Sequence, residues 1–231
     1  MRYTQTETEH DVTLEPAKPP VASVVLLHGL GADGRDFVPI VPELALPESI
    51  PVRFVFPHAP MRPVTISGGY VMRAWYDITA FTPEGRADAN GLTAALRQVT
   101  RYIEQEQQRG IATERVVLAG FSQGGATALH VALRHPARLA GVLAMSCYLP
   151  FPAKLASEKS AANADLPILM CHGSRDPVVH VGMGLEARDE LKAQGYPVEW
   201  HEYPIQHEVN ANEIADISRW LQRRLANPVA G

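Results

Sequence analysis

The chain has 231 residues, 46% of them hydrophobic, and its formal net charge is -4. A chain of this length can bury one substantial core, so we expect a single domain over residues 1–231. The mild charge and the scattered Lys and Arg argue against a partner such as nucleic acid or an anionic membrane.

The N-terminal region, residues 1–20, has polar residues where a secretion signal would need an apolar run, and its Pro-rich end indicates a strand followed by a turn. We therefore expect a cytoplasmic protein with no transmembrane segment. Cys147 and Cys171 lie inside apolar, strand-like segments. Free buried thiols are expected there rather than a disulfide.

Continuous apolar runs bounded by Gly and Pro predict strands along the chain, and a last strand follows them. The predicted strands are 21–29, 52–57, 115–120, 139–146, 166–173 and 198–204. Such runs are typical of strands covered on both faces of a parallel sheet. Helical periodicity appears at 88–109, 185–194 and 212–225. The alternation predicts an α/β fold with a mostly parallel central sheet and helices on both faces.

Residues 57–87 show neither strand nor helix periodicity. A loop of this length in a compact domain is usually functional or poorly ordered. Its large apolar side chains are Tyr70, Met72, Trp75, Tyr76 and Phe81. We expect this loop to line an apolar pocket; the alternative is a loop that only covers a sheet edge.

The sequence GFSQG, residues 120–124, matches the pattern G-x-S-x-G and separates a predicted strand from a predicted helix. This context predicts that Ser122 lies on the tight turn of a nucleophile elbow. Free N–H groups at the start of the helix would face a developing negative oxygen. The uncharged run around it, 116–133, carries too many glycines and polar side chains for a membrane helix. The alternative is a serine that only caps the helix.

A serine nucleophile needs a base, and that base needs an acid to orient it. Asp176 follows the strand predicted at 166–173, and the proline after it disfavours a helix, so we expect its carboxylate on a loop. His207 follows the last predicted strand and fits the chain order serine, aspartate, histidine. Position at a strand end alone does not exclude His28, His58 and His172.

The oxyanion needs two hydrogen-bond donors. One is expected to be the backbone N–H of Gln123, directly after the nucleophile. The other is expected from the HGLG loop after the first central strand, with the N–H of Leu30 as the candidate. Two alternatives exist for this loop. It could be a glycine-rich turn that binds no ligand, or a turn that binds a nucleotide.

Several blocks of the chain, taken together, resemble one known family. They are LLHGLGADGRDF, PHAPMRPVTISGGYVMRAWYDI, GFSQGG, SCYLP, HGSRDPVV and the HEV after the last strand. The blocks are similar to those of the bacterial carboxylesterase and acyl-protein thioesterase family of α/β-hydrolases, which includes lysophospholipase-like members. The resemblance extends from about Val21 to Leu225.

The resemblance implies an α/β-hydrolase fold without a large separate cap domain. It implies a catalytic triad of Ser122, Asp176 and His207, and an oxyanion hole formed by Leu30 and Gln123. The residues expected to contact substrate are Gly29, Met72, Trp75, Tyr76 and Val178.

The chain departs from the family pattern at His180, where a proline is usual, and at Glu208, where a small residue is usual. A carboxylate beside the base favours the imidazolium form, so we expect Glu208 to influence the pH dependence of turnover.

The sequence therefore predicts a serine carboxylesterase that hydrolyses short- to medium-chain esters through an acyl-enzyme intermediate. The alternatives are an acyl-protein thioesterase or lysophospholipase with the same triad, and a non-catalytic binding module. We expect no metal and no organic cofactor. The expected partners are a small-molecule ester or, as the alternative, an acylated protein, and the expected state is a monomer or homodimer.

Overall fold

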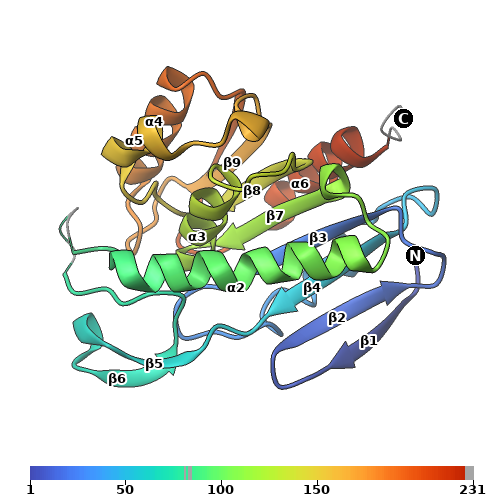
Figure 1. Cartoon of the computed structure of the whole chain (residues 1–231), viewed down its shortest axis with the longest axis horizontal. Helices are drawn as coiled ribbons and strands as arrows, with labels where there is room; N and C mark the ends of the chain where they lie inside the picture. The colour runs from blue at the N-terminus through green and yellow to red at the C-terminus, as the bar shows by residue number, and fades with distance from the viewer. Residues whose placement is uncertain (81, 83–84, 227–231) are drawn as a thin grey trace.

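The computed structural model describes residues 1–80, 82 and 85–226, so Phe81 lies outside the described residues. One eight-stranded sheet forms the centre of the molecule (Figure 1). Its strands are β1 (Tyr3–Glu7), β2 (Asp11–Pro16), β3 (Ala22–Leu27), β4 (Val52–Pro57), β7 (Val116–Phe121), β8 (Gly141–Met145), β9 (Ile168–Gly173) and β10 (Val198–Tyr203).

The strand order in this sheet is β1-β2-β4-β3-β7-β8-β9-β10. β1 and β2 form an antiparallel hairpin, and β2 also pairs antiparallel with β4. The strands β4, β3, β7, β8, β9 and β10 run parallel to one another. The carboxyl ends of six neighbouring strands therefore meet at one edge of the sheet. Ligand sites of open α/β sheets form outside this edge.

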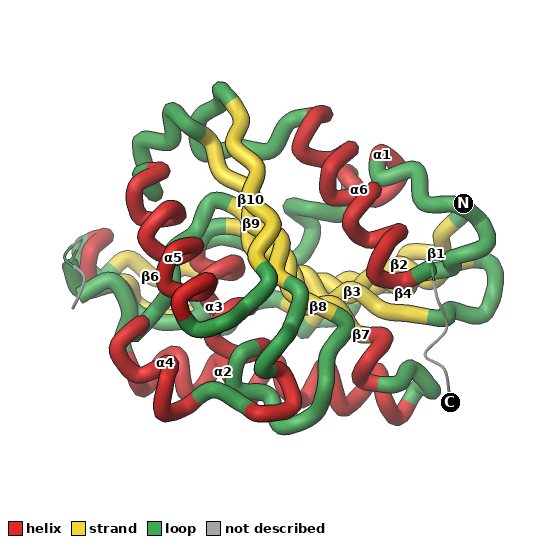
Figure 2. The backbone as a smooth tube through the Cα atoms, turned by 90° about the horizontal axis from the view of Figure 1, so that it is seen from above, coloured by secondary structure: helices red, strands yellow, loops and turns green. Residues whose placement is uncertain are grey.

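Helices cover both faces of the sheet (Figure 2). They are α1 (Ile40–Glu43), α2 (Ala89–Gln108), α3 (Gln123–Ala132), α4 (Pro152–Glu158), α5 (Val181–Ala193) and α6 (Ala211–Leu225). Apolar residues of α2, α3, α4 and α5 pack on one face, and those of α1 and α6 pack on the other.

Alternate residues of the central strands enter the two cores. On β3, Val25 and Leu27 join the core under α2 and α3, whereas Val24 and Leu26 join the core under α6. Both sets are nearly inaccessible to solvent. Burial on both faces explains why the apolar runs are continuous, and it confirms the predicted sheet with helices on both sides.

The segment 57–87 contains more regular structure than its sequence predicts. It forms a two-stranded antiparallel sheet of β5 (Met61–Val64) and β6 (Tyr70–Arg73), joined by the 3-10 helix η1 (Thr65–Ser67). These strands are only four residues long and half of their residues are exposed, so they lack the apolar run that marks a buried strand.

The helix α5 begins at Val181, whereas the sequence predicts a start at Leu185. The prediction missed the first turn because it contains Gly182 and Gly184, which do not fit a helical pattern. Across the described parts of the chain, no helix combines the length and the hydropathy needed to span a membrane.

Candidate active site

The predicted site residues come from loops that follow four parallel strands of the central sheet. Leu30 follows β3, Ser122 follows β7, Asp176 follows β9 and His207 follows β10. Since these strands point the same way, the four loops emerge at the same edge of the sheet.

Ser122 has a strained backbone conformation. Its φ of 56° and ψ of -120° are disfavoured for a residue with a Cβ atom. It sits directly between β7 and α3 at the N-cap position, yet its side chain makes no capping hydrogen bond. Its N–H donates to the carbonyl of Met145 on β8 (2.9 Å). Helix capping therefore does not account for this serine, and the turn has the geometry of a nucleophile elbow.

The glycines around Ser122 allow the strand and the helix to approach closely. A Cβ atom on Gly120 would lie 2.2 Å from the carbonyl oxygen of Gly124. A Cβ atom on Gly124 would lie 2.1 Å from the carbonyl oxygen of Leu27. A side chain at either position would force the turn apart, so both glycines are required by packing around the serine.

Asp176 is 3% exposed, and its carboxylate is held at both oxygens. Oδ1 accepts hydrogen bonds from the N–H groups of Val178 and Val179, each at 2.8 Å. Oδ2 lies 2.6 Å from Nδ1 of His207. The ring of His207 packs on the ring of Phe121, with centroids 4.6 Å apart. Phe121 precedes Ser122, so this contact brings the histidine beside the nucleophile elbow.

The other strand-end histidines have structural partners. His28 is buried; Nδ1 lies 2.7 Å from the carbonyl oxygen of Gly29, and Nε2 accepts from the N–H of Ala59. Burial lowers the pKa of His28 to about 4. His58 accepts at Nδ1 from the N–H of Gly34 (3.0 Å). Both rings brace the loops beneath the site.

His172 is a closer rival, since Nε2 lies 3.8 Å from Oδ2 of Asp176. The same nitrogen is 2.8 Å from the carbonyl oxygen of Val179, to which it donates. Burial lowers the pKa of His172. The shorter contact from His207 therefore identifies the histidine that Asp176 orients.

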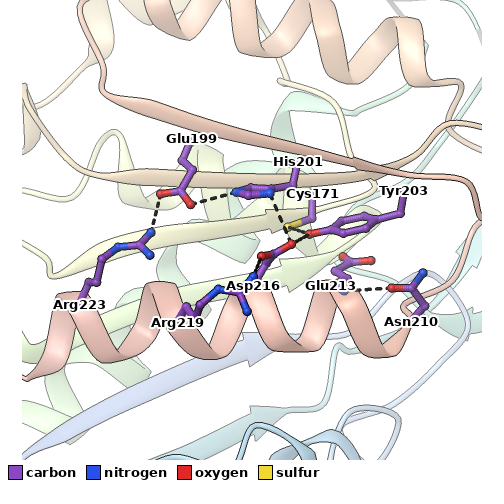
Figure 3. Close-up of polar contacts among 9 residues, drawn as sticks. All are labelled: Cys171, Glu199, His201, Tyr203, Asn210, Glu213, Asp216, Arg219 and Arg223. Carbon is purple, nitrogen blue, oxygen red and sulfur yellow. Dashed lines mark hydrogen bonds and ion pairs between the residues drawn. The ribbon is translucent and has the colours of Figure 1, made fainter.

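His201 belongs to a separate polar cluster between β10 and α6 (Figure 3). Its Nε2 lies 2.9 Å from Oε1 of Glu199, and its Nδ1 lies 3.4 Å from Oδ2 of Asp216. A carboxylate therefore lies beside each ring nitrogen. His201 is therefore held within this cluster, away from Asp176.

The HGLG loop lies against Ser122. A Cβ atom on Gly29 would be 3.4 Å from the Cβ of Ser122. Within the described part of the chain, the N–H groups of Leu30 and Gln123 donate to no protein acceptor. Both remain available to an oxyanion.

Two side-chain hydrogen bonds fix Gln123. Its Oε1 accepts from the N–H of Trp75, and its Nε2 donates to the carbonyl of Tyr76, both at 2.9 Å. Trp75 is fully buried and also donates from Nε1 to the carbonyl of His28 (2.9 Å). Trp75 thus ties the two loops expected to form the oxyanion hole, and its contact with substrate stays a prediction.

A cavity of about 660 Å³ opens beside the serine. We call it the site cavity; its lining includes Leu30, Ile66, Ser67, Tyr76, Ile78, Arg86, Ser122, Gln123, Tyr148, Pro177, Val178, Val179, His180 and Met183. Tyr76 and Val178 were expected there. Gly29 and Met72 are not among its lining residues; Met72 lies behind Gly31 of the HGLG loop, where its Sδ would be 3.5 Å from an added Cβ.

Sequence reasoning missed the cavity walls at Ile66, Ile78 and Met183. Ile66 is in η1 and Met183 is in the first turn of α5, two elements that the periodicity did not reveal. The apolar character of the three side chains was a signal, but their convergence depends on the tertiary fold.

The model of the phospholipase/carboxylesterase family matches residues 8–225. Acyl-protein thioesterase 1 of Neurospora crassa is 36% identical over 213 residues, covering 88% of this chain and 87% of the relative.

Solved structures agree with this relationship. Arabidopsis thaliana SOBER1 superposes with a TM-score of 0.83 at 33% identity, covering 88% of this chain and 99% of that one. Zea mays acyl-protein thioesterase 2 superposes with a TM-score of 0.84 at 28% identity, covering 93% and 98%. The fold is that of the α/β-hydrolases. The chain belongs to the phospholipase/carboxylesterase family and is a serine hydrolase.

Proposed function

We propose that this chain hydrolyses acyl thioesters and esters, with Ser122 as nucleophile, His207 as general base and Asp176 as the acid that orients it. His207 accepts the Ser122 proton while the serine oxygen attacks the acyl carbonyl. The tetrahedral intermediate releases the thiol or alcohol, which takes the proton from His207, and leaves an acyl-enzyme. Water repeats these steps and releases the carboxylic acid.

One observation carries the proposal: the 2.6 Å contact between the buried carboxylate of Asp176 and Nδ1 of His207, at the same sheet edge as the strained Ser122. A carboxylate at Nδ1 leaves Nε2 of the ring to accept the serine proton. The amides of Leu30 and Gln123 are the proposed oxyanion donors. Losing one such donor typically lowers turnover about a hundredfold to a thousandfold.

The substrate we propose is a fatty acyl group on a protein cysteine. The relatives named acyl-protein thioesterase support this alternative over the short- to medium-chain ester that was the main prediction from sequence. The site cavity supports it as well, because Ile66, Ile78 and Met183 offer apolar walls to a hydrocarbon chain. Burying one methylene group contributes about 0.8 kcal/mol. An acylated protein also fits the cytoplasmic location expected from the sequence.

A fluorophosphonate probe tests the chemistry. We expect one covalent adduct on Ser122, located by peptide mass spectrometry, and its loss in Ser122→Ala. Ser157→Ala, which alters an exposed serine on α4, serves as the control and should label fully. Equal ester hydrolysis by Ser122→Ala and the unaltered protein would refute the proposal and favour a binding module.

A substrate panel tests the leaving group. It compares an S-palmitoyl peptide, the same peptide with an O-palmitoyl serine, p-nitrophenyl palmitate and a lysophospholipid. The proposal expects the highest kcat/KM for the thioester peptide. Preference for the lysophospholipid or for the small ester would restore the corresponding alternative.

A further inference from the structure

A second cavity of about 590 Å³ lies next to the site cavity. Its lining includes Arg86, Tyr148, Phe151, Ala153, Lys154 and Ala187. We call it the distal cavity. Each of the two cavities falls within the range of about 300–1,000 Å³ that is usual for small-molecule sites.

The two cavities share walls. Arg86 and Tyr148 line both. The helix α5 runs past both as well, since Met183 faces the site cavity and Ala187, one turn later, faces the distal cavity. The distal cavity is therefore adjacent to the site cavity, and Arg86 and Tyr148 lie between the two.

Hydrogen bonds hold Tyr148 in this partition. Its hydroxyl donates to the carbonyl oxygen of Arg86 at 2.8 Å. Its single proton is used there, so the contact with the hydroxyl of Tyr76, also 2.8 Å, has Tyr76 as donor. The guanidinium of Arg86 lies 5.9 Å from the centre of the Tyr148 ring. The ring is positioned by both neighbours but is only half-buried, unlike Tyr76, which is fully buried.

Phe151, on the wall of the distal cavity, has a strained backbone. Its φ of 48° and ψ of 54° place it in the left-handed region, which is uncommon for a bulky residue. Lys154 lies over its ring, with Nζ 5.1 Å from the centroid. Strain of this kind concentrates at ligand sites, where the surrounding structure maintains it. The phenyl ring of Phe151 thus lies at the cavity wall although its backbone has a disfavoured conformation.

The chemistry of the distal cavity suits a hydrocarbon. Ala87, Leu149 and Ala187 are buried apolar residues of its wall. Its charged members are of both signs, and two of them, Lys154 and Glu186, are exposed. Such a rim offers no net attraction to an anionic or cationic ligand. The distal cavity thus has apolar walls, as the site cavity has at Ile66, Ile78 and Met183.

We propose that the distal cavity receives the methyl end of a long acyl chain, and that Tyr148 is the side chain that limits how far the chain extends. This inference rests on the proposed hydrolase function of Ser122. Short acyl groups occupy the site cavity alone, while long ones displace the Tyr148 ring and continue along α5.

The first test removes the partition. The measured quantity is the ratio of kcat/KM for p-nitrophenyl palmitate to kcat/KM for p-nitrophenyl octanoate. In Tyr148→Ala the ratio is expected to rise about fifteenfold, the effect of burying two further methylene groups at about fourfold each. Tyr148→Phe keeps the ring, so its ratio should change less than that of Tyr148→Ala.

The second test blocks the distal cavity without altering the partition. Ala153→Trp places a large side chain at this cavity from an exposed position of α4, where it should not disturb the fold. The palmitate to octanoate ratio should fall about tenfold or more. The matched control is Ala156→Trp, an exposed alanine on the same helix that is outside the lining of the distal cavity. Its ratio should equal that of the unaltered protein.

Fluorophosphonate labelling of each variant verifies an intact nucleophile. Equal ratios in Ala153→Trp and Ala156→Trp, or an unchanged ratio in labelled Tyr148→Ala, would overturn the role of the distal cavity. Absence of any hydrolysis dependent on Ser122 would instead refute the proposed function itself.

Discussion

Glu213 allows a quantitative prediction about stability and pH. This residue is in the first turn of α6, next to the N-cap Asn210, and its side chain is fully buried (Figure 3). Within the described structure neither carboxylate oxygen has a hydrogen-bond partner. Burial, with a further contribution from the negative charge of Asp216, raises the pKa of Glu213 from 4.5 to about 8. The folded protein therefore keeps Glu213 protonated at neutral pH.

The sign of the pH effect follows from the two states of the chain. Below pH 4.5 the folded and unfolded chains both hold the proton, and the group does not affect the pH dependence of unfolding. Between 4.5 and about 8 only the unfolded chain releases it, so the free energy of unfolding falls as pH rises. At about 1.4 kcal/mol per pH unit, the loss is roughly 3 kcal/mol at pH 7 and roughly 4 kcal/mol at pH 8.

Urea denaturation of the protein and of Glu213→Gln, each at pH 5.5 and 8.5, measures this effect. From the lower to the higher pH the unaltered protein should lose roughly 3 kcal/mol more stability than Glu213→Gln, because the amide does not titrate. Other titrating groups are common to both proteins and cancel in the comparison. Glu202→Gln, which neutralises an exposed glutamate on β10, should behave as the unaltered protein. Equal pH dependence in Glu213→Gln and the unaltered protein would refute the reasoning.

Three further predictions concern the site and its support. Asp176→Asn should lower kcat about ten-thousandfold with little loss of stability, because an amide favours the wrong tautomer of the base; steady-state kinetics with thermal unfolding checks both parts. Gly124→Ala should lower the melting temperature and ester turnover together, since its Cβ would lie 2.1 Å from the Leu27 carbonyl oxygen; an unchanged melting temperature would contradict this. Burial raises the pKa of the free thiols Cys147 and Cys171, so iodoacetamide at pH 8 should modify them in urea but not in the folded protein, as mass spectrometry can show.

The central sheet and the order of the site residues could be predicted from the sequence because their signals are local. A strand buried on both faces needs a continuous apolar run, as β7 shows. Parallel strands bring their carboxyl ends to one edge, so the loops holding Ser122, Asp176 and His207 had to emerge there together. The N-terminal hairpin was expected only as a strand and turn region, since β1 is almost entirely exposed and carries no apolar pattern.

The cavities could not be predicted, because their walls come from segments that meet only in the folded chain. Tyr148 follows β8, and Arg86 precedes α2, yet the two are in contact and line both cavities. The hydrogen bonds of Trp75 could not be predicted either. An aromatic residue in a loop near the site suggests a substrate contact, but its indole N–H and its backbone N–H are both used to hold neighbouring loops. Side-chain hydrogen bonding of this kind has no periodic signature in sequence.

Backbone strain connects the parts of the site that sequence reasoning treated separately. Among the described non-glycine residues, Ser122, Ser146 and Phe151 have positive φ and follow the ends of the adjacent strands β7 and β8; Ala45 is the fourth such residue. Ser146 is fully buried, and its hydroxyl has no hydrogen-bond partner within the described structure. Burying an unsatisfied polar group costs free energy. Conformations of this kind persist only where neighbouring packing over-determines them. The parallel strands supply that constraint, since the N–H of Ser122 bonds to Met145 and the N–H of Ser146 bonds to Cys171 on the next strand. The sheet thus fixes the turn at Ser122 and the start of the loop that leads to Tyr148 in the same way, through a backbone hydrogen bond to the neighbouring strand.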